Sequence, residues 1–189
     1  MTTVTPKLFS VAEYHRLSEL GFFQENERIE LIRGQIIQMA AKGTPHSVCN
    51  TLLFGELFTL LQGQATIRNQ EPIILGNDSE LEPDIVIVRN RSDRYLDSHP
   101  SMADILLVIE VSDSTLKYDR ETKLALYAES GINHYWLLNL VANCLEAYSQ
   151  PYKIQGGFEY AARQIYLPNS AIALPHVSPI VLDLSKVFP

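Results

Sequence analysis

An almost unbroken apolar run, Ile105–Ser112 (ILLVIEVS), lies in the middle of the sequence and contains one charged residue, Glu110. A run without polar alternation is typical of a strand that is buried on both faces of a sheet. Such a sheet needs helices or further layers on both sides. The run therefore predicts a central strand, and its single carboxylate requires a separate explanation.

The remaining patterns predict helices and strands in mixed order. A capping box, formed by Ser10 and Glu13, predicts a helix over 9–20. Two short runs around Arg33 and Gly34 predict a β-hairpin over 28–39. Further helices are expected over 46–61, 114–130 and 182–187, and further strands over 65–75, 84–88, 134–139, 145–149, 158–166 and 171–174. This order indicates one α/β or α+β domain over residues 1–189, with a mixed sheet flanked by helices.

Two carboxylates stand where burial would exclude an unpaired charge. Asp84 opens the strand DIVIV, and Glu110 interrupts the apolar run. A buried carboxylate is costly unless it is paired, hydrogen-bonded or bound to a metal. If the two strands are neighbours, these carboxylates meet at one end of the sheet. With a backbone carbonyl, for which Val111 is well placed, they would suit Mg²⁺, which keeps several waters. A turn role for Asp84 and a buried salt bridge for Glu110 remain alternatives.

Composition and missing motifs narrow the function classes. A net charge of −7 argues against a protein that coats nucleic acid non-specifically, because such binding neutralises many phosphates. No apolar run approaches the ~20 residues of a membrane span, and no leader pattern opens the chain, so we expect a cytoplasmic protein. Cys49 and Cys144 are expected to be buried, reduced thiols. Phosphate-loop, nucleophile-elbow and zinc motifs are absent, which leaves carboxylates to carry the chemistry.

Several motifs together resemble the Uma-two family, described as restriction endonucleases of the PD-(D/E)xK nuclease superfamily. They are the segments 82–88 (EPDIVIV), 107–112 (LVIEVS), 119–123 (DRETK) and 131–138 (GINHYWLL), together with Tyr127. The upstream segments 30–36 (ELIRGQI) and 45–46 (PH) also fit. The resemblance therefore extends over about 9–188.

The resemblance implies a restriction-endonuclease-like fold, in which Asp84 and Glu110 bind the catalytic metal. The lysine of the usual E-x-K motif falls at Ser112, which carries no positive charge. The family resemblance suggests that Lys123, on the following helix, takes its place. The spacing of four allows this, because it puts Asp119, Lys123 and Tyr127 on one helix face. A solvated pairing of Lys123 with Asp119 is the alternative, and Lys117 is the substitute candidate.

Other candidates carry less weight. An acidic residue from the N-terminal region often completes the metal site in this superfamily, so Glu30 is a possible third ligand, although a pairing with an arginine is as reasonable. His46, at a helix start, could contact substrate or simply cap the helix. Basic residues that could contact phosphates are Lys117, Arg120, Arg89, Arg91 and Arg94, whose ordinary role is a solvated surface. Gln70 and Glu71 could reach the same edge of the sheet.

These observations predict an endonuclease that uses Mg²⁺ or Mn²⁺ to hydrolyse DNA phosphodiester bonds. We expect a homodimer, because cutting both strands of a duplex needs two sites. One alternative is a catalytically silent module of the same fold that binds nucleic acid or a protein partner. The acidic net charge and the serine at position 112 favour this alternative. A hydrolase of small phosphorylated substrates is another alternative.

Overall fold

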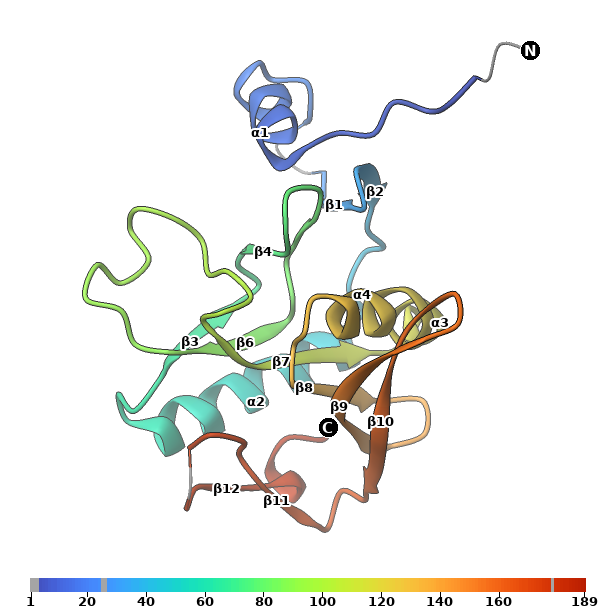
Figure 1. Cartoon of the computed structure of the whole chain (residues 1–189). Coiled ribbons are helices and arrows are strands. Elements are labelled where there is room, and N and C mark those ends of the chain that lie inside the picture. The colour runs from blue at the N-terminus through green and yellow to red at the C-terminus, as the bar shows by residue number, and fades with distance from the viewer. Residues whose placement is uncertain (1–3, 25–26, 178) are drawn as a thin grey trace.

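The computed structural model describes residues 4–24, 27–177 and 179–189. Six strands form the central sheet: β3 (Thr66–Asn69), β6 (Ile85–Val88), β7 (Ile105–Ser112), β8 (His134–Asn139), β9 (Cys144–Ile154) and β10 (Gly157–Tyr166). Their order is β10-β9-β8-β7-β6-β3 (Figure 1). Strands β7 and β8 run parallel, and the other neighbouring pairs are antiparallel. The predicted mixed sheet is therefore confirmed.

Strand β7 lies inside this sheet, between β6 and β8, and is buried from its second residue onward. This confirms the central position that its apolar run predicts. The crossover from β7 to its parallel neighbour β8 is helical, as a parallel connection requires. It consists of α3 (Leu116–Tyr118), the π-helix η1 (Asp119–Lys123) and α4 (Leu124–Glu129). The single helix expected over 114–130 therefore contains a π-turn.

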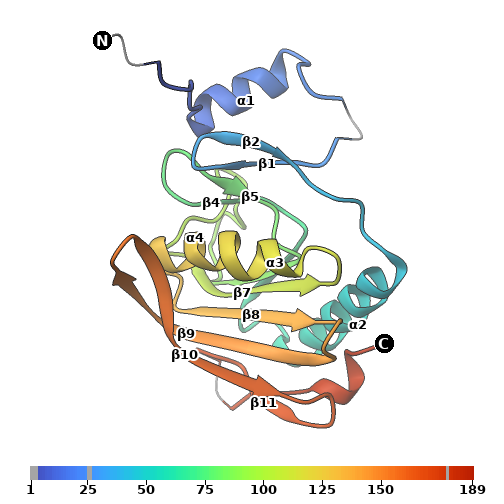
Figure 2. The ribbon, with the colours of Figure 1, turned by 90° about the vertical axis from the view of Figure 1, so that its right-hand side faces the viewer.

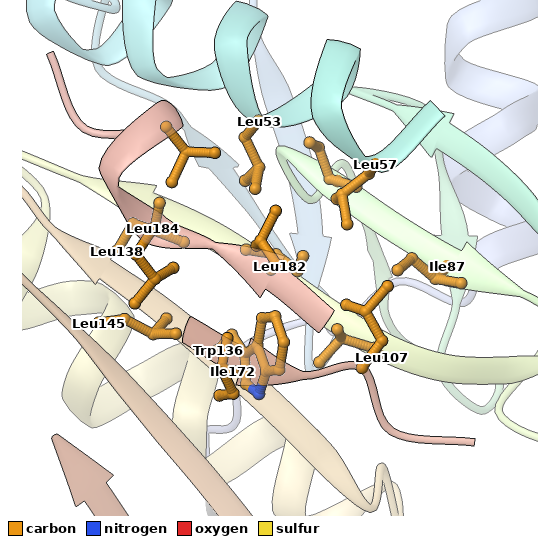
Figure 3. Packing of buried hydrophobic residues seen from close by; sticks show 14 of the residues in the cluster. Leu53, Leu57, Ile87, Leu107, Trp136, Leu138, Leu145, Ile172, Leu182 and Leu184 are labelled. Atoms are coloured by element: carbon orange, nitrogen blue, oxygen red, sulfur yellow. The ribbon is translucent and has the colours of Figure 1, made fainter. Parts of the chain in front are cut away.

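The sheet is covered on both faces. Helix α2 (Thr44–Leu61) covers one face, and its Leu53 and Leu57 belong to the same buried cluster as Leu107 of β7 (Figure 3). The chain end joins this layer through β11 (Ala171–Ala173), β12 (Val181–Asp183) and the 3₁₀ helix η2 (Leu184–Lys186). The segment from α3 to α4 covers the opposite face (Figure 2).

The terminal helix expected over 182–187 is partly wrong. Residues 181–183 form strand β12, which pairs with β11, and the helical part is limited to η2. The burial of Val181, Leu182 and Asp183 alternates exposed, buried, exposed, which is the period of a strand. Three residues are too short a window for that period to be recognised beside the apolar spacing of the following turn.

A second, smaller sheet and helix α1 (Val11–Glu19) form the N-terminal layer (Figure 2). The sheet contains β1 (Ile29–Ile32), β2 (Gln35–Gln38), β4 (Ile73–Ile74) and β5 (Glu80–Leu81), in the order β2-β1-β5-β4. The hairpin of β1 and β2 and the Ser10–Glu13 capping box are confirmed. Strand β5 lies between the strands expected over 65–75 and 84–88, in a stretch where the sequence predicts no strand.

Two expectations from composition can be compared with the described residues. Cys49 and Cys144 are both buried free thiols, as expected. Within the described part of the chain, no helix combines the length and the apolar character that crossing a membrane requires.

Candidate active site

The antiparallel pairing of β6 and β7 brings Asp84 and Glu110 together. Ile85 is opposite Ile109, so the residues that flank this pair lie at the same end of both strands. The backbone amide of Asp84 donates a hydrogen bond to Glu110 Oε2 at 3.3 Å. Both side chains are buried, with 4% and 3% of their residues' surface exposed.

Asp84 is surrounded by donors from three directions. His46 Nε2 lies 2.8 Å from Asp84 Oδ2, and the Val111 amide donates to the same oxygen at 2.9 Å. Lys42 Nζ lies 3.3 Å from Oδ1, which also accepts from Gln70. Burial raises the pKa of Asp84, but the hydrogen bond and charge of His46, together with Lys42, outweigh burial and hold the pKa below its ordinary value. Asp84 is therefore an ionised carboxylate.

Local sequence explains how His46 and Lys42 reach the site. Helix α2 begins after Gly43, with Pro45 in its first turn, where a missing amide proton costs nothing. His46 therefore lies in the first turn of α2, pointing its ring at Asp84. Lys42 lies just before the helix and is 19% exposed.

Glu110 is held by Lys123, which bridges two carboxylates. Lys123 Nζ donates to Glu110 Oε1 at 2.9 Å and to Glu30 Oε1 at 3.1 Å. The hydroxyl of Tyr127 donates to Glu110 Oε1 at 2.7 Å, and the amide of Glu82 donates to Glu30 at 3.0 Å. Lys123 is therefore a buried bridge between β1 and β7, and the solvated pairing with Asp119 is wrong.

Burial acts on both members of the Glu110–Lys123 pair. It raises the pKa of Glu110 to about 8, although the charge of Lys123 opposes this shift. Burial also lowers the pKa of Lys123, but the charges of Glu110 and Glu30 outweigh it and leave the pKa above its ordinary value. The raised pKa of Glu110 favours a neutral carboxyl group, whereas the raised pKa of Lys123 favours a charged ammonium group. Because both oxygens of Glu110 already accept hydrogen bonds, we assign the ionised pair.

These groups line one pocket of about 40 Å³. Its polar lining comprises Arg28, Glu30, Lys42, His46, Glu82, Asp84, Glu110, Asp113, Ser114, Thr115, Asp119 and Lys123, and Val111 also lines it. The volume is sufficient for an ion or a few waters, because one water needs roughly 10–15 Å³. The pocket is therefore small and strongly charged.

The donor chemistry of the pocket fits a hard divalent cation. Carboxylate oxygens are the ligands that Mg²⁺ prefers, and Asp84 and Glu110 present them side by side. Glu30 also lines the pocket, and its Oε2 is buried without a hydrogen-bond partner among the described residues. In residues 4–24, 27–177 and 179–189, however, no three His, Cys, Asp or Glu side chains are grouped closely enough to hold a metal by themselves. The fit is that of a cation with two protein carboxylates and several waters.

Some predicted contact residues lie outside the pocket. Lys117 is exposed on α3, and Arg120 pairs with the buried Glu146 on β9. Arg89 follows β6 at the end opposite Asp84, about 16 Å away at ~3.3 Å per residue. Arg91 and Arg94 lie in the loop beyond Arg89, so these three arginines do not border the pocket, which corrects the expected stripe beside the site.

Sequence reasoning missed Lys42, which contacts Asp84 across 42 positions in the chain. The surrounding residues, Ala40, Ala41 and Gly43, carry no signal of a site, and the contact depends on how the loop enters α2. Asp119 was considered only as a neighbour of Lys123. It is buried and hydrogen-bonded to Ser112 and Thr115.

The sequence and the fold can be compared with those of known proteins. None of the curated proteins matches the sequence. A solved structure of "a putative nuclease belonging to DUF820", from Anabaena variabilis ATCC 29413, has a TM-score of 0.68 and 18% identity. The match covers 91% of this chain and 96% of that chain, and at this identity it shows the shared fold. The chain has the restriction-endonuclease-like fold, and the family model Uma2, described as "Putative restriction endonuclease", matches residues 11–185, so the chain belongs to the Uma-two family.

Proposed function

We propose that this protein is a metal-dependent endonuclease that hydrolyses phosphodiester bonds in DNA. The observation that carries the proposal is the convergence of Asp84, Glu110 and Lys123 in one buried pocket. Two carboxylates and a lysine are the groups that bind a cation and stabilise negative charge on phosphate. Family membership supports the nuclease activity, and the choice of DNA as substrate is part of the proposal.

Asp84 and Glu110 would hold Mg²⁺ or Mn²⁺ together with several waters, and the backbone carbonyl of Val111 would be a further ligand. Glu30, which pairs with Lys123, would border the cation without ligating it. When bound, the cation supplies a water of lowered pKa and neutralises charge on the phosphate. His46 donates to Asp84 and fixes the orientation of this carboxylate, as hydrogen-bond partners of metal ligands commonly do.

The cationic side chains act on the phosphate and the attacking water. Lys123 is charged and lies 2.9 Å from Glu110, so it can orient the water or stabilise the negative charge of the transition state. Lys42 is partly exposed, and burial lowers its pKa against the effect of Asp84. Its flexible side chain lets the ammonium group leave Asp84 and contact a phosphate oxygen instead. Lys117 and Arg120 are more distant candidates for contacts to the DNA backbone.

Plasmid cleavage tests this proposal. We expect native protein to nick supercoiled DNA in Mg²⁺ or Mn²⁺ and to lose activity in a chelator. Asp84→Asn and Glu110→Gln should lower the rate by at least about 1,000-fold, and Lys123→Met by at least about 100-fold, because each removes a charge from the reacting site. Direct conversion to linear DNA would support the homodimer that two strand cuts require.

Glu121→Gln is the matched control, because Glu121 is an exposed carboxylate on the same helical segment. It should cleave at the native rate. If native protein binds the cation by calorimetry but cuts no double-stranded, single-stranded or supercoiled DNA, the nuclease proposal is wrong.

A catalytically silent nucleic-acid or partner-binding module is the second candidate. It is favoured by the ion pairs of the pocket: Lys42 and His46 already pair with Asp84, and Lys123 with Glu110, so the charges of these two carboxylates are compensated without a cation. Cation binding that Asp84→Asn abolishes, without any cleavage by native protein, would support this candidate.

A further inference from the structure

We propose that Asp119 is a positioning residue. With the hydroxyls of Ser112 and Thr115 it fixes the π-turn that aims Lys123 at Glu110. This inference rests on the proposed function, because it explains how Lys123 reaches the site in a chain that lacks the lysine of E-x-K.

Asp119, Ser112 and Thr115 form a hydrogen-bonded group, here called the clamp. It joins the end of strand β7 to the helical segment that follows it. Asp119 is 3% exposed, and its Oδ2 accepts hydrogen bonds from Ser112 Oγ and from Thr115 Oγ1, the latter at 2.7 Å. Ser112 is fully buried and lies two residues after Glu110, on the same face of β7. The serine in the lysine position therefore ties the catalytic strand to the helix that carries Lys123.

The π-turn begins at Asp119 and ends at Lys123. Residues spaced four apart in an ordinary α-helix turn by about 400°, so Asp119, Lys123 and Tyr127 would drift by about 80° over two steps. A wider π-turn removes much of this drift, and all three side chains are buried, with at most 3% exposed. Single π-turns inside helices occur often at functional sites.

Two other roles, a helix cap and a metal ligand, explain the contacts of Asp119 less well. A helix cap would lie at a helix end, but Asp119 is inside the continuous helical segment 116–129. Asp119 is not grouped with two other acidic, histidine or cysteine side chains closely enough to hold a metal among the described residues, and its Oδ2 already accepts from two hydroxyls. Hydroxyl donors to a buried carboxylate make charge-assisted hydrogen bonds, which hold geometry strongly.

The first test is structural and does not depend on activity. Crystal structures of native protein and of the double variant Ser112→Ala/Thr115→Ala would be compared. In the native protein Lys123 Nζ should lie within hydrogen-bond distance of Glu110 and Glu30, and in the variant it should lose at least one of these contacts. Retention of both contacts in the variant overturns the proposal.

The second test is kinetic. The double variant should lower kcat for plasmid nicking about 10- to 100-fold with KM within twofold of native, because a displacement of about 1 Å in a reacting group has an effect of this size. Thr115→Ser keeps the hydroxyl and should restore the native kcat that Thr115→Ala lowers. Thr122→Ala, which removes a hydroxyl of the same turn outside the clamp, is the matched control.

These outcomes separate the clamp from the nuclease proposal. If native protein does not cleave DNA, the nuclease proposal fails and the crystal structures still decide the clamp. An unchanged kcat in the double variant, or a raised KM with native kcat, overturns the positioning role. Should the double variant fail to fold, kcat of Thr115→Ala is compared with kcat of Thr115→Ser instead. Equal kcat values in these two variants also overturn the positioning role.

Discussion

Lys123 connects three parts of the protein through one ammonium group. It joins Glu110 of the central sheet to Glu30 of the N-terminal sheet from a helix that covers both. Such a bridge is stable only while every charge keeps its partner, because an uncompensated buried charge is very costly. The residue that would act on the phosphate is therefore also a structural connection.

Lys123→Met keeps the length of the side chain and removes its charge. We expect the free energy of unfolding to fall by about 3–5 kcal/mol, because Glu110 and Glu30 then lack their shared cation. Urea denaturation at pH 7.5 measures this loss. Lys117→Met is the control, since Lys117 is exposed, and its effect should lie within about 0.5 kcal/mol of native. A loss below about 1 kcal/mol for Lys123→Met would show that the bridge contributes little.

The carboxylates could be predicted at this scale, whereas some of their partners could not. Asp84 and Glu110 break a local rule, since one charge directly precedes a buried strand and the other lies inside one, and a broken rule is visible in one sequence. Lys42 breaks no rule, because an exposed-looking lysine beside small residues is ordinary. Its contact with Asp84 depends on the path of the chain between β2 and α2, which no local pattern specifies.

At the scale of elements, predictability followed the length and regularity of the pattern. The run of β7 and the hairpin of β1 and β2 were predicted from their own residues. Strand β5 has two residues and depends on its partners β1 and β4, so its sequence alone reads as a turn. The π-turn was also beyond prediction, because it begins at Asp119, whose hydrogen bond to Ser112 of β7 no local pattern specifies.

The hairpin turn gives a prediction about Gly34. Arg33 and Gly34 both have positive φ, 49° and 74°, as a two-residue type I′ turn requires. A Cβ at Gly34 would lie 2.7 Å from Leu8 Cβ, so Gly34→Ala should lower the free energy of unfolding by about 1–3 kcal/mol. Thermal and urea unfolding measure the loss.

Gly55→Ala provides a control of opposite sign. Gly55 lies inside α2, and a Cβ there meets nothing within 4 Å, so the substitution should stabilise the protein by up to about 1 kcal/mol. Equal stability of Gly34→Ala and native protein would show that the turn tolerates a side chain and that its described conformation is wrong.

Across the whole molecule, buried ionic groups link layers that hydrophobic packing alone would hold less specifically. One such group centres on Glu146 of β9, which is fully buried. It accepts hydrogen bonds from Arg120, Asn139, Tyr148 and Arg163, which belong to η1, β8, β9 and β10. The predicted strands and helices included all these residues, but their convergence on one carboxylate depends on the strand order, which the sequence does not specify.

The Glu146 group predicts how stability depends on pH. Burial raises the pKa of Glu146, but the hydrogen bonds of Arg120, Tyr148 and Asn139 outweigh burial and lower the pKa from 4.5 to about 2. Because the folded pKa is below the unfolded one, the ionised carboxylate stabilises the fold above pH about 4.5, and this contribution is lost as the pH falls towards 2. The free energy of unfolding of native protein should therefore exceed that of Glu146→Gln by about 1–3 kcal/mol at pH 7, and the two should differ little at pH 2.

Urea denaturation of both proteins between pH 2 and pH 7 measures this difference. Glu121→Gln, at an exposed position, should follow the native curve at every pH. Since Asp84 also has a lowered pKa, both native protein and Glu146→Gln should lose stability in acid, and the difference between them isolates Glu146. A difference that stays constant from pH 7 to pH 2 would mean that Glu146 contributes through shape rather than charge, and that the layers are joined by packing alone.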